Sequence, residues 1–228
     1  MNRVTGVMKI HMRDKTMLYL PWVIMSFSFI VNLVIGLLVQ EGEGIYTGGV
    51  ASIYVYMLVA GLVMLPQTFP FALGLSVRRK DYFWGTTAVI ALASVAFSFA
   101  LFLLSVVESS WTDGWGVDLH FFKLPYLNDG TFFEQLWIDF SLLVNLFFLG
   151  FAISSVHRRF GKNGMWLFTI IAFVALSVVS FFCTYYEWWG DIFLWLAAHT
   201  AFQLSLWMFV LTIIYALAAY FLLRRSTV

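Results

Sequence analysis

Six long stretches of this chain contain no Asp, Glu, Lys or Arg, and no other feature constrains the fold as strongly. They cover residues 16–40, 44–77, 82–107, 140–157, 163–186 and 192–223. A transmembrane helix needs about 20 mainly apolar residues, so five stretches are long enough and 140–157 is just sufficient. With 62% hydrophobic and 11% charged residues, against about 45–50% and 25% in an average soluble domain, the composition excludes a soluble globule.

We expect an all-α polytopic membrane protein that forms a single transmembrane domain over residues 1–228. Only helices and closed barrels satisfy their backbone in lipid, and the stretches are continuous rather than alternating, which disfavours a barrel. The six expected spans lie near 17–39, 50–75, 83–107, 137–156, 165–186 and 199–222. The longest polar segment, 108–135, combines Gly, Asp and aromatic residues and predicts a cap on the outer surface.

The basic residues predict the orientation, because cytoplasmic loops retain Lys and Arg. Twelve of the 13 fall on one side: Arg3, Lys9, Arg13, Lys15, Arg78, Arg79, Lys80, Arg158, Arg159, Lys162, Arg224 and Arg225. The outer loops hold Lys123 together with Glu41, Glu43, Glu108, Asp113, Asp118, Asp129, Glu134, Glu187 and Asp191. We therefore expect both termini in the cytoplasm of a multi-pass protein of the cell (plasma) membrane.

Residues 1–16 predict an interfacial helix. At 100° per residue its apolar face comprises Val4, Val7, Met8, His11 and Met12. Lys9 and Arg13 lie opposite, as in a helix that rests in the headgroup plane, and their charges make anionic membrane lipid an expected partner. A plain positive-inside anchor is nearly as good an explanation.

No catalytic, metal or cofactor site is expected in this chain. It has no phosphate-binding loop, no zinc-protease helix and no nucleophile elbow. The four histidines, His11, His120, His157 and His199, are scattered, and Cys183 is the single cysteine. The 13 basic residues are balanced by 12 acidic ones, so nucleic acid is not an expected partner.

The interiors of the expected spans carry no charge. Asp139 comes nearest, one turn inside the outer end of the fourth span, where we expect it to be exposed at the interface. Ion-coupled pumps usually hold buried ionisable groups, so the driving force of a transporter would have to come from another subunit. Four uncharged polar residues lie within the spans, and they either hydrogen-bond between helices or line the path of an amphipathic cargo: Asn32, Gln67, Asn145 and Gln203.

The inner end of the second span carries an unusual motif, which begins at Pro66 and runs to Phe83. Pro66 and Pro70 are expected to break or bend the helix, and Gly74 to let the chain turn before a basic cluster. With its interfacial helix, six spans and a Gly-Leu-Ser-x-Arg-Arg-x-Asp-Tyr turn, the sequence resembles type-2 ATP-binding-cassette (ABC) permeases. It looks most like the small bacterial members that pair with a separate ATPase subunit.

The resemblance implies where that ATPase would bind. The turn would be the ATPase-coupling segment, consisting of Leu75, Ser76, Val77, Arg78, Arg79, Lys80, Asp81 and Tyr82. Secondary contacts would come from Lys9, Arg13, Asp14, Lys15, His157, Arg158 and Arg159. ATP and magnesium would be bound by the partner, and the chain would pair with a second permease, identical or similar. Segment 187–198 fits a re-entrant hairpin of the family.

These features predict a permease subunit that exports a hydrophobic or amphipathic cargo, such as a peptide, an antibiotic or a lipid-like molecule. The alternative is a non-transporting membrane scaffold or sensor that recruits a cytoplasmic partner. It accounts equally well for the absence of charged span interiors, but less well for the proline-rich turn and the interfacial helix. An intramembrane enzyme would need a constellation of residues that the sequence does not present.

Overall fold

The computed structural model describes residues 3–39, 44–128 and 130–225, so the outer-loop residues Glu41, Glu43 and Asp129 lie outside its description. The helices are α1 (Arg3–Arg13), α2 (Lys15–Val39), α3 (Ala51–Gly74), α4 (Arg79–Ser110), α5 (Phe132–Tyr185), α6 (Trp189–Ala197) and α7 (Ala201–Arg224). Short elements complete the described chain: the 3-10 helices η1 (Gly48–Val50) and η2 (Gly114–Gly116) and the strands β1 (Ile45–Tyr46) and β2 (Leu119–His120). The all-α class is confirmed.

Five helices, α2, α3, α4, α5 and α7, are long and apolar enough to cross a membrane, which indicates a membrane protein. The predicted ranges of the first, second, third and sixth spans agree with α2, α3, α4 and α7 to within about one helical turn.

Helix α5 has 54 residues and would measure about 80 Å if straight, far more than the ~30 Å hydrocarbon core of a membrane. The bend lies at Gly161, whose φ of 66° and ψ of −166° are accessible essentially to glycine alone. The fourth and fifth predicted spans, 137–156 and 165–186, fall on the two arms of this helix.

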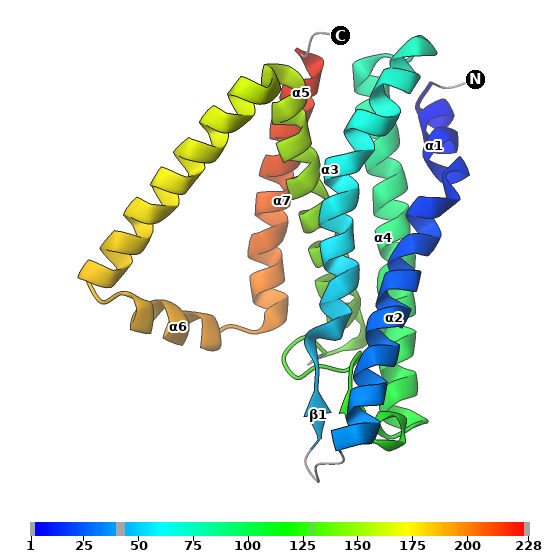
Figure 1. The fold of residues 1–228 in the computed structure, drawn as a ribbon, viewed down its shortest axis with the longest axis vertical. Coiled ribbons are helices and arrows are strands. Elements are labelled where there is room, and N and C mark those ends of the chain that lie inside the picture. The colour runs from blue at the N-terminus through cyan, green and yellow to red at the C-terminus, as the bar shows by residue number, and fades with distance from the viewer. Residues whose placement is uncertain (1–2, 40–43, 129, 226–228) are drawn as a thin grey trace.

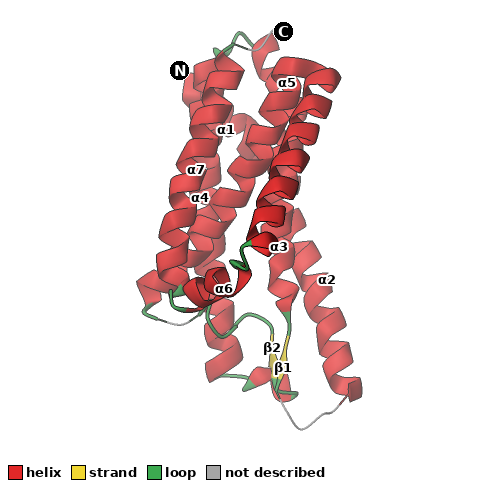
Figure 2. Cartoon of the chain, turned by 90° about the vertical axis from the view of Figure 1, so that its left-hand side faces the viewer, coloured by secondary structure: helices red, strands yellow, loops and turns green. Residues whose placement is uncertain are grey.

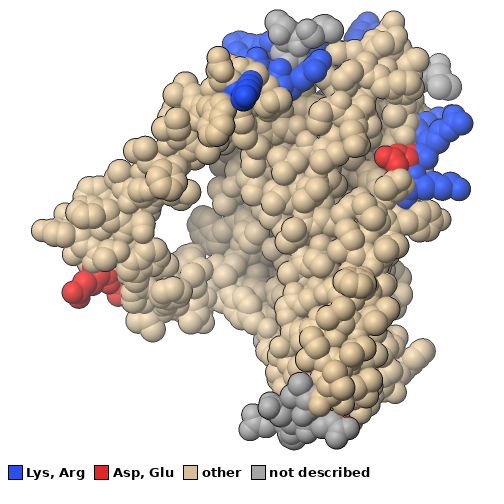
Figure 3. All heavy atoms as spheres, viewed as in Figure 1, with Lys and Arg blue, Asp and Glu red and all other residues tan. Residues whose placement is uncertain are grey.

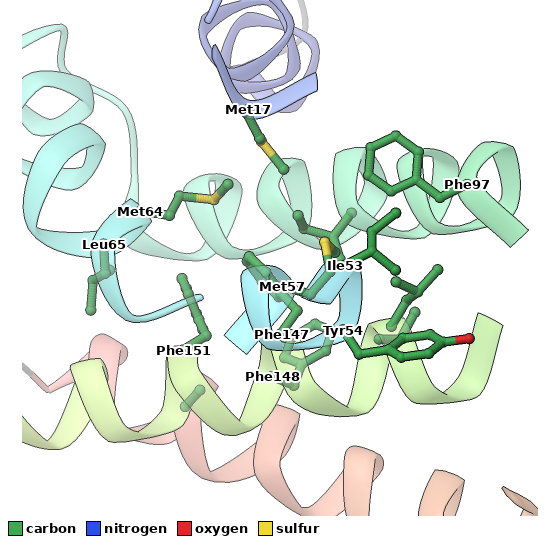
Figure 4. Packing of buried hydrophobic residues seen from close by; sticks show 14 of the residues in the cluster. Met17, Ile53, Tyr54, Met57, Met64, Leu65, Phe97, Phe147, Phe148 and Phe151 are labelled. Atoms are coloured by element: carbon green, nitrogen blue, oxygen red, sulfur yellow. The ribbon is translucent and has the colours of Figure 1, made fainter. Parts of the chain in front are cut away.

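The first arm of α5 packs between α3 and α7, and α4 and α2 complete the bundle (Figures 1 and 2). Met57, Phe147 and Phe151 are fully buried at the centre, where side chains of α3 and α5 meet (Figure 4). The two helices approach closely through Gly61 and Gly150, because a Cβ at Gly61 would meet the Phe147 carbonyl oxygen and one at Gly150 that of Leu58. Small residues permit such close helix crossings in membranes.

The second arm of α5 and helix α6 stand away from this bundle. The arm leaves it after Gly161, α6 crosses at the far end, and α7 returns to the bundle (Figure 1). Within 165–198, Cys183 is the one described residue classed as buried, and the aromatic and aliphatic side chains on all sides are exposed. The predicted re-entrant segment 187–198 contains a short helix, α6, that connects the second arm of α5 to α7.

The segment predicted as a cap folds against α2 and against the C-terminal end of α4. Phe29 of α2 makes edge contacts with Trp115 and Phe121, at ring-centroid distances of 4.9 and 5.3 Å. β1 and β2 form a short parallel pair, with Ile45 opposite Leu119, which ties the cap to the segment before α3. This pairing was not predicted, because two-residue strands carry no periodic signal.

Pro66 and Pro70 do not break α3, which continues as a helix to Gly74. The prediction that Gly74 makes the following turn is wrong. The turn that follows uses Ser76, with φ of 58°, whereas Gly74 is still helical. A left-handed residue other than glycine is uncommon in such a turn.

Candidate coupling site

Lys and Arg side chains gather at the end of the molecule where both described termini lie, and α1 carries a further group of them (Figures 1 and 3). We call this end the inner end. The predicted coupling segment 75–82 lies there, in the connection between α3 and α4. The second predicted contact region, around Arg158, lies before the bend of α5 at the same end.

The turn between α3 and α4 is closed by backbone hydrogen bonds. The Ser76 and Val77 amides donate to the carbonyl oxygens of Leu73 (2.9 Å) and Ala72 (3.2 Å). Arg78 is extended and forms the N-cap of α4, and Asp81 lies in the first turn, where a carboxylate favours the helix dipole. The turn is therefore a defined structure rather than a loose loop.

The side chains of the coupling segment divide into an outward and an inward set. Leu75, Ser76, Arg78 and Lys80 are exposed, and Val77, Arg79 and Asp81 are half-buried. Tyr82 is completely buried. The segment therefore presents basic and apolar groups to a partner while anchoring itself in the bundle through one tyrosine.

Tyr82 connects three helices. Its hydroxyl is hydrogen-bonded to Thr68 Oγ1 of α3 at 2.7 Å, and its ring meets Phe69 edge-on at 5.0 Å between centroids. The ring of His11, from α1, lies 5.8 Å away on an edge contact. A displacement of Tyr82 would therefore be transmitted to α1 and α3.

Helix α1 rests on α4, and His11 fixes it there. His11 Nε2 is hydrogen-bonded to Thr86 Oγ1 at 2.9 Å, and only 2% of the residue is exposed. Burial lowers the pKa of His11 from 6.5 to about 4, against an opposing effect of Asp14. Val7 packs where a Cβ on Gly85 would clash. The apolar face predicted for α1 is therefore largely a protein contact, although Met12 remains exposed.

The end of the first arm of α5 contacts Phe69, which also contacts Tyr82. The guanidinium of Arg158 lies over the Phe69 ring, 5.5 Å from its centroid. Arg79 donates to the carbonyl oxygen of Arg224 at 3.3 Å, which adds the end of α7. His11, Tyr82, Phe69 and Arg158 thus form one continuous series of contacts, here called the inner junction.

The remaining predicted contact residues lie around the inner junction. Lys9, Arg13, Asp14 and Lys15 are exposed on α1 and at the start of α2. His157 is exposed, while Arg159 is half-buried with its guanidinium 4.9 Å from the Phe160 ring centroid. All predicted ATPase-contact residues therefore lie at one end of the molecule.

The four predicted cargo-path residues are not brought together. Asn32 donates to the Ser28 carbonyl oxygen of its own helix at 2.8 Å, and Gln203 caps α7 through Thr200. Asn145 donates to Met208 O (3.1 Å) and Thr212 Oγ1 (2.9 Å) of α7, an interhelical bond of the kind expected in membranes. Gln67 lines a cavity of about 170 Å³ between α1, α2 and α3.

The expectation that Asp139 is exposed is wrong. It is 9% exposed, and Tyr54 of α3 donates a hydrogen bond of 2.5 Å to its Oδ1. The partner lies 85 positions away in the chain, so local sequence gives no indication of the pair.

Glu108 was predicted only as an acidic residue of the outer loop. It is fully buried, and its two carboxylate oxygens accept four hydrogen bonds: from Trp115 Nε1 (2.9 Å) and from the amides of Phe121 (3.0 Å), Phe122 (2.9 Å) and Lys123 (2.8 Å). This side chain joins Trp115 to the backbone of residues 121–123 and so links two parts of the cap. In the sequence, only the position of Glu108 at the boundary between an apolar and a polar segment indicates that it could be buried.

Within residues 3–39, 44–128 and 130–225, no group of three or more His, Cys, Asp or Glu is arranged to hold a metal ion. Comparisons with protein-family models, with curated proteins and with solved structures find no match to this chain.

Proposed function

We propose that this chain is the permease subunit of an ABC exporter whose ATPase is a separate cytoplasmic subunit. The observation that carries the proposal is the inner junction. Arg78 and Lys80 are exposed in the connection between α3 and α4. Tyr82, which follows them in α4, is buried and contacts both α1 and α3. A partner that moves this turn would act on several helices together, as an ATP-driven conformational switch requires.

In this proposal the chain crosses the plasma membrane six times, with the two arms of α5 as separate spans. Both termini lie in the cytoplasm. The gathering of Lys and Arg at the end that holds the termini supports this orientation (Figure 3).

The working unit contains two permease chains, identical or similar, and two ATPase chains that bind ATP and magnesium. Closing of the ATPase pair moves the coupling segments, and the interface between the permeases alternates between inward and outward access. The exposed apolar arm of α5 supports the association with a second permease, since its side chains contact little else in the described chain. A hydrophobic or amphipathic cargo suits a path of aromatic and small polar groups.

The test replaces Arg78, Arg79 and Asp81 by Ala in the permease and measures the ATP hydrolysis of the ATPase that co-purifies with it. We expect the stimulation by the permease to be lost, because these side chains surround the docking turn, while membrane insertion is retained. The matched control replaces Lys123, Asp113 and Asp118 of the cap by Ala and should keep the stimulation. Undiminished stimulation in the first variant would refute the coupling assignment.

A non-transporting scaffold or sensor is the second candidate, and the cap held by Glu108 favours it because an ordered outer surface can bind a ligand. Co-purification separates the two functions. A bound ATPase supports the permease, whereas a kinase or protease partner supports the sensor.

A further inference from the structure

A cleft at the inner end combines two cations with an apolar wall. It has a volume of about 390 Å³ and is lined by Lys9, Ile10, Arg13 and Asp14 from α1 and its end, and by Phe71 and Leu75 from the end of α3. Lys9 and Arg13 are four residues apart on one helix and therefore project on the same side. Phe71 and Leu75 are each 58% exposed.

Neither cation forms an ion pair with a described residue of the protein. Among residues 3–39, 44–128 and 130–225, both ion pairs found involve His120, and neither involves Lys9 or Arg13. The one carboxylate in the lining, Asp14, accepts a hydrogen bond from the Thr16 amide at 3.1 Å and so is engaged at the start of α2. The lining carries two positive charges against one negative charge, which leaves an excess positive charge.

We propose that this cleft binds one anionic phospholipid of the inner leaflet. Its headgroup phosphate lies between the Lys9 ammonium and the Arg13 guanidinium, and an acyl chain lies along Phe71 and Leu75. The chemistry fits because basic residues attract anionic lipid at the membrane surface, while a free phosphate would leave the apolar wall without a partner.

A lipid in this cleft joins α1 to Leu75, the first residue of the coupling segment. The cleft shares Lys9, Arg13, Asp14 and Leu75 with the proposed ATPase contacts, and its place at the inner leaflet rests on the proposed orientation. Lipid retention is measured on the permease without an ATPase, so either proposal can fail while the other stands. If both hold, the lipid is a third component of the inner junction.

The experiment uses the full-length protein in detergent, titrated with phosphatidylglycerol or phosphatidylcholine, with native mass spectrometry counting the lipids retained. We expect one phosphatidylglycerol to bind more tightly than phosphatidylcholine. Lys9→Gln with Arg13→Gln should weaken it about 30-fold, from the usual contribution of each basic residue near an anionic surface. The matched control, Lys162→Gln with Arg225→Gln, removes two charges at the same end and should retain the lipid.

A second pair of variants tests the apolar wall. Phe71→Ser with Leu75→Ser leaves every charge in place and should also lose the lipid, and circular dichroism checks that all variants keep their helix content. Equal retention of the two lipids by the unchanged protein would overturn the proposal, and so would unaltered retention in the Lys9/Arg13 variant. Displacement of the lipid by millimolar inorganic phosphate would show a phosphate site instead and would likewise overturn it.

Discussion

Replacing Glu108 by Ala should open the cap. The change leaves four N–H donors without their acceptor, and each such loss costs about 1 kcal/mol after partial hydration. The free energy of the closed cap relative to the open cap would then rise by about 4 kcal/mol. The population of the open cap would increase by roughly several hundred-fold. The bundle should persist, since Glu108 lies at the end of α4.

Trypsin can measure this opening at Lys123. The side chain of Lys123 is exposed, but its amide donates to Glu108 at 2.8 Å, so the backbone cannot enter a protease site while the cap is closed. Cleavage follows the open population when closing is faster than cutting. Mass spectrometry of protein in lipid nanodiscs should show the Lys123–Leu124 bond cut faster in Glu108→Ala by a factor approaching that estimate.

The control is Asp113→Asn, which changes a carboxylate of the same loop that is not the acceptor of these four donors. It should leave the cleavage rate unchanged. A Glu108→Ala rate within about threefold of the unchanged protein would refute the argument, because the four hydrogen bonds would then contribute almost nothing to closure.

Two further predictions concern the helices. Gly61→Ala or Gly150→Ala should lower the free energy of unfolding by about 1–3 kcal/mol, because the added methyl group meets backbone across the α3–α5 crossing. Thermal unfolding in detergent measures this loss. The control Gly6→Ala, whose methyl group meets open space, should not show it. Docking of α1 on α4 should weaken as pH falls from 6.5 towards 4. In this range His11 is protonated when α1 is undocked but stays neutral when α1 is docked, because burial lowers its pKa to about 4. Amide exchange in α1, corrected for intrinsic rates, should be about 20-fold less protected at pH 5 than at pH 7. His11→Gln should show no such change.

The positions of the long apolar segments could be predicted from charge alone, but six spans are expected and five long helices are found, because two expected spans share α5. Each expected span coincides with a helix or with one arm of α5, because a membrane segment is defined by composition over about 20 residues. The basic residues from Arg158 to Lys162 also marked the place where α5 bends. The sequence does not predict which side chains of the coupling segment are buried. Tyr82 is buried and Arg78 is exposed because of the positions of α1 and α3 in the fold.

The burial of two acidic side chains cannot be predicted from the local sequence. Asp139 and Glu108 both looked like surface acids, since each lies near an outer boundary of a helix. Their partners are Tyr54, far away in the chain, and backbone amides of an irregular loop. Hydrogen bonds of this kind compensate the cost of burial, but the donors carry no local periodicity from which they could be found.

The detour through the second arm of α5 has a consequence for biosynthesis. The bundle of α3 and the first arm of α5 is complete only when α7 arrives, and some 40 residues must first leave the ribosome, which takes a few seconds at the usual rate. Until then Asn145 lacks its partners Met208 and Thr212 and exposes an amide to lipid. In a nascent chain that stalls within the arm, the Asn145 side-chain amide would therefore remain without these two partners in the membrane.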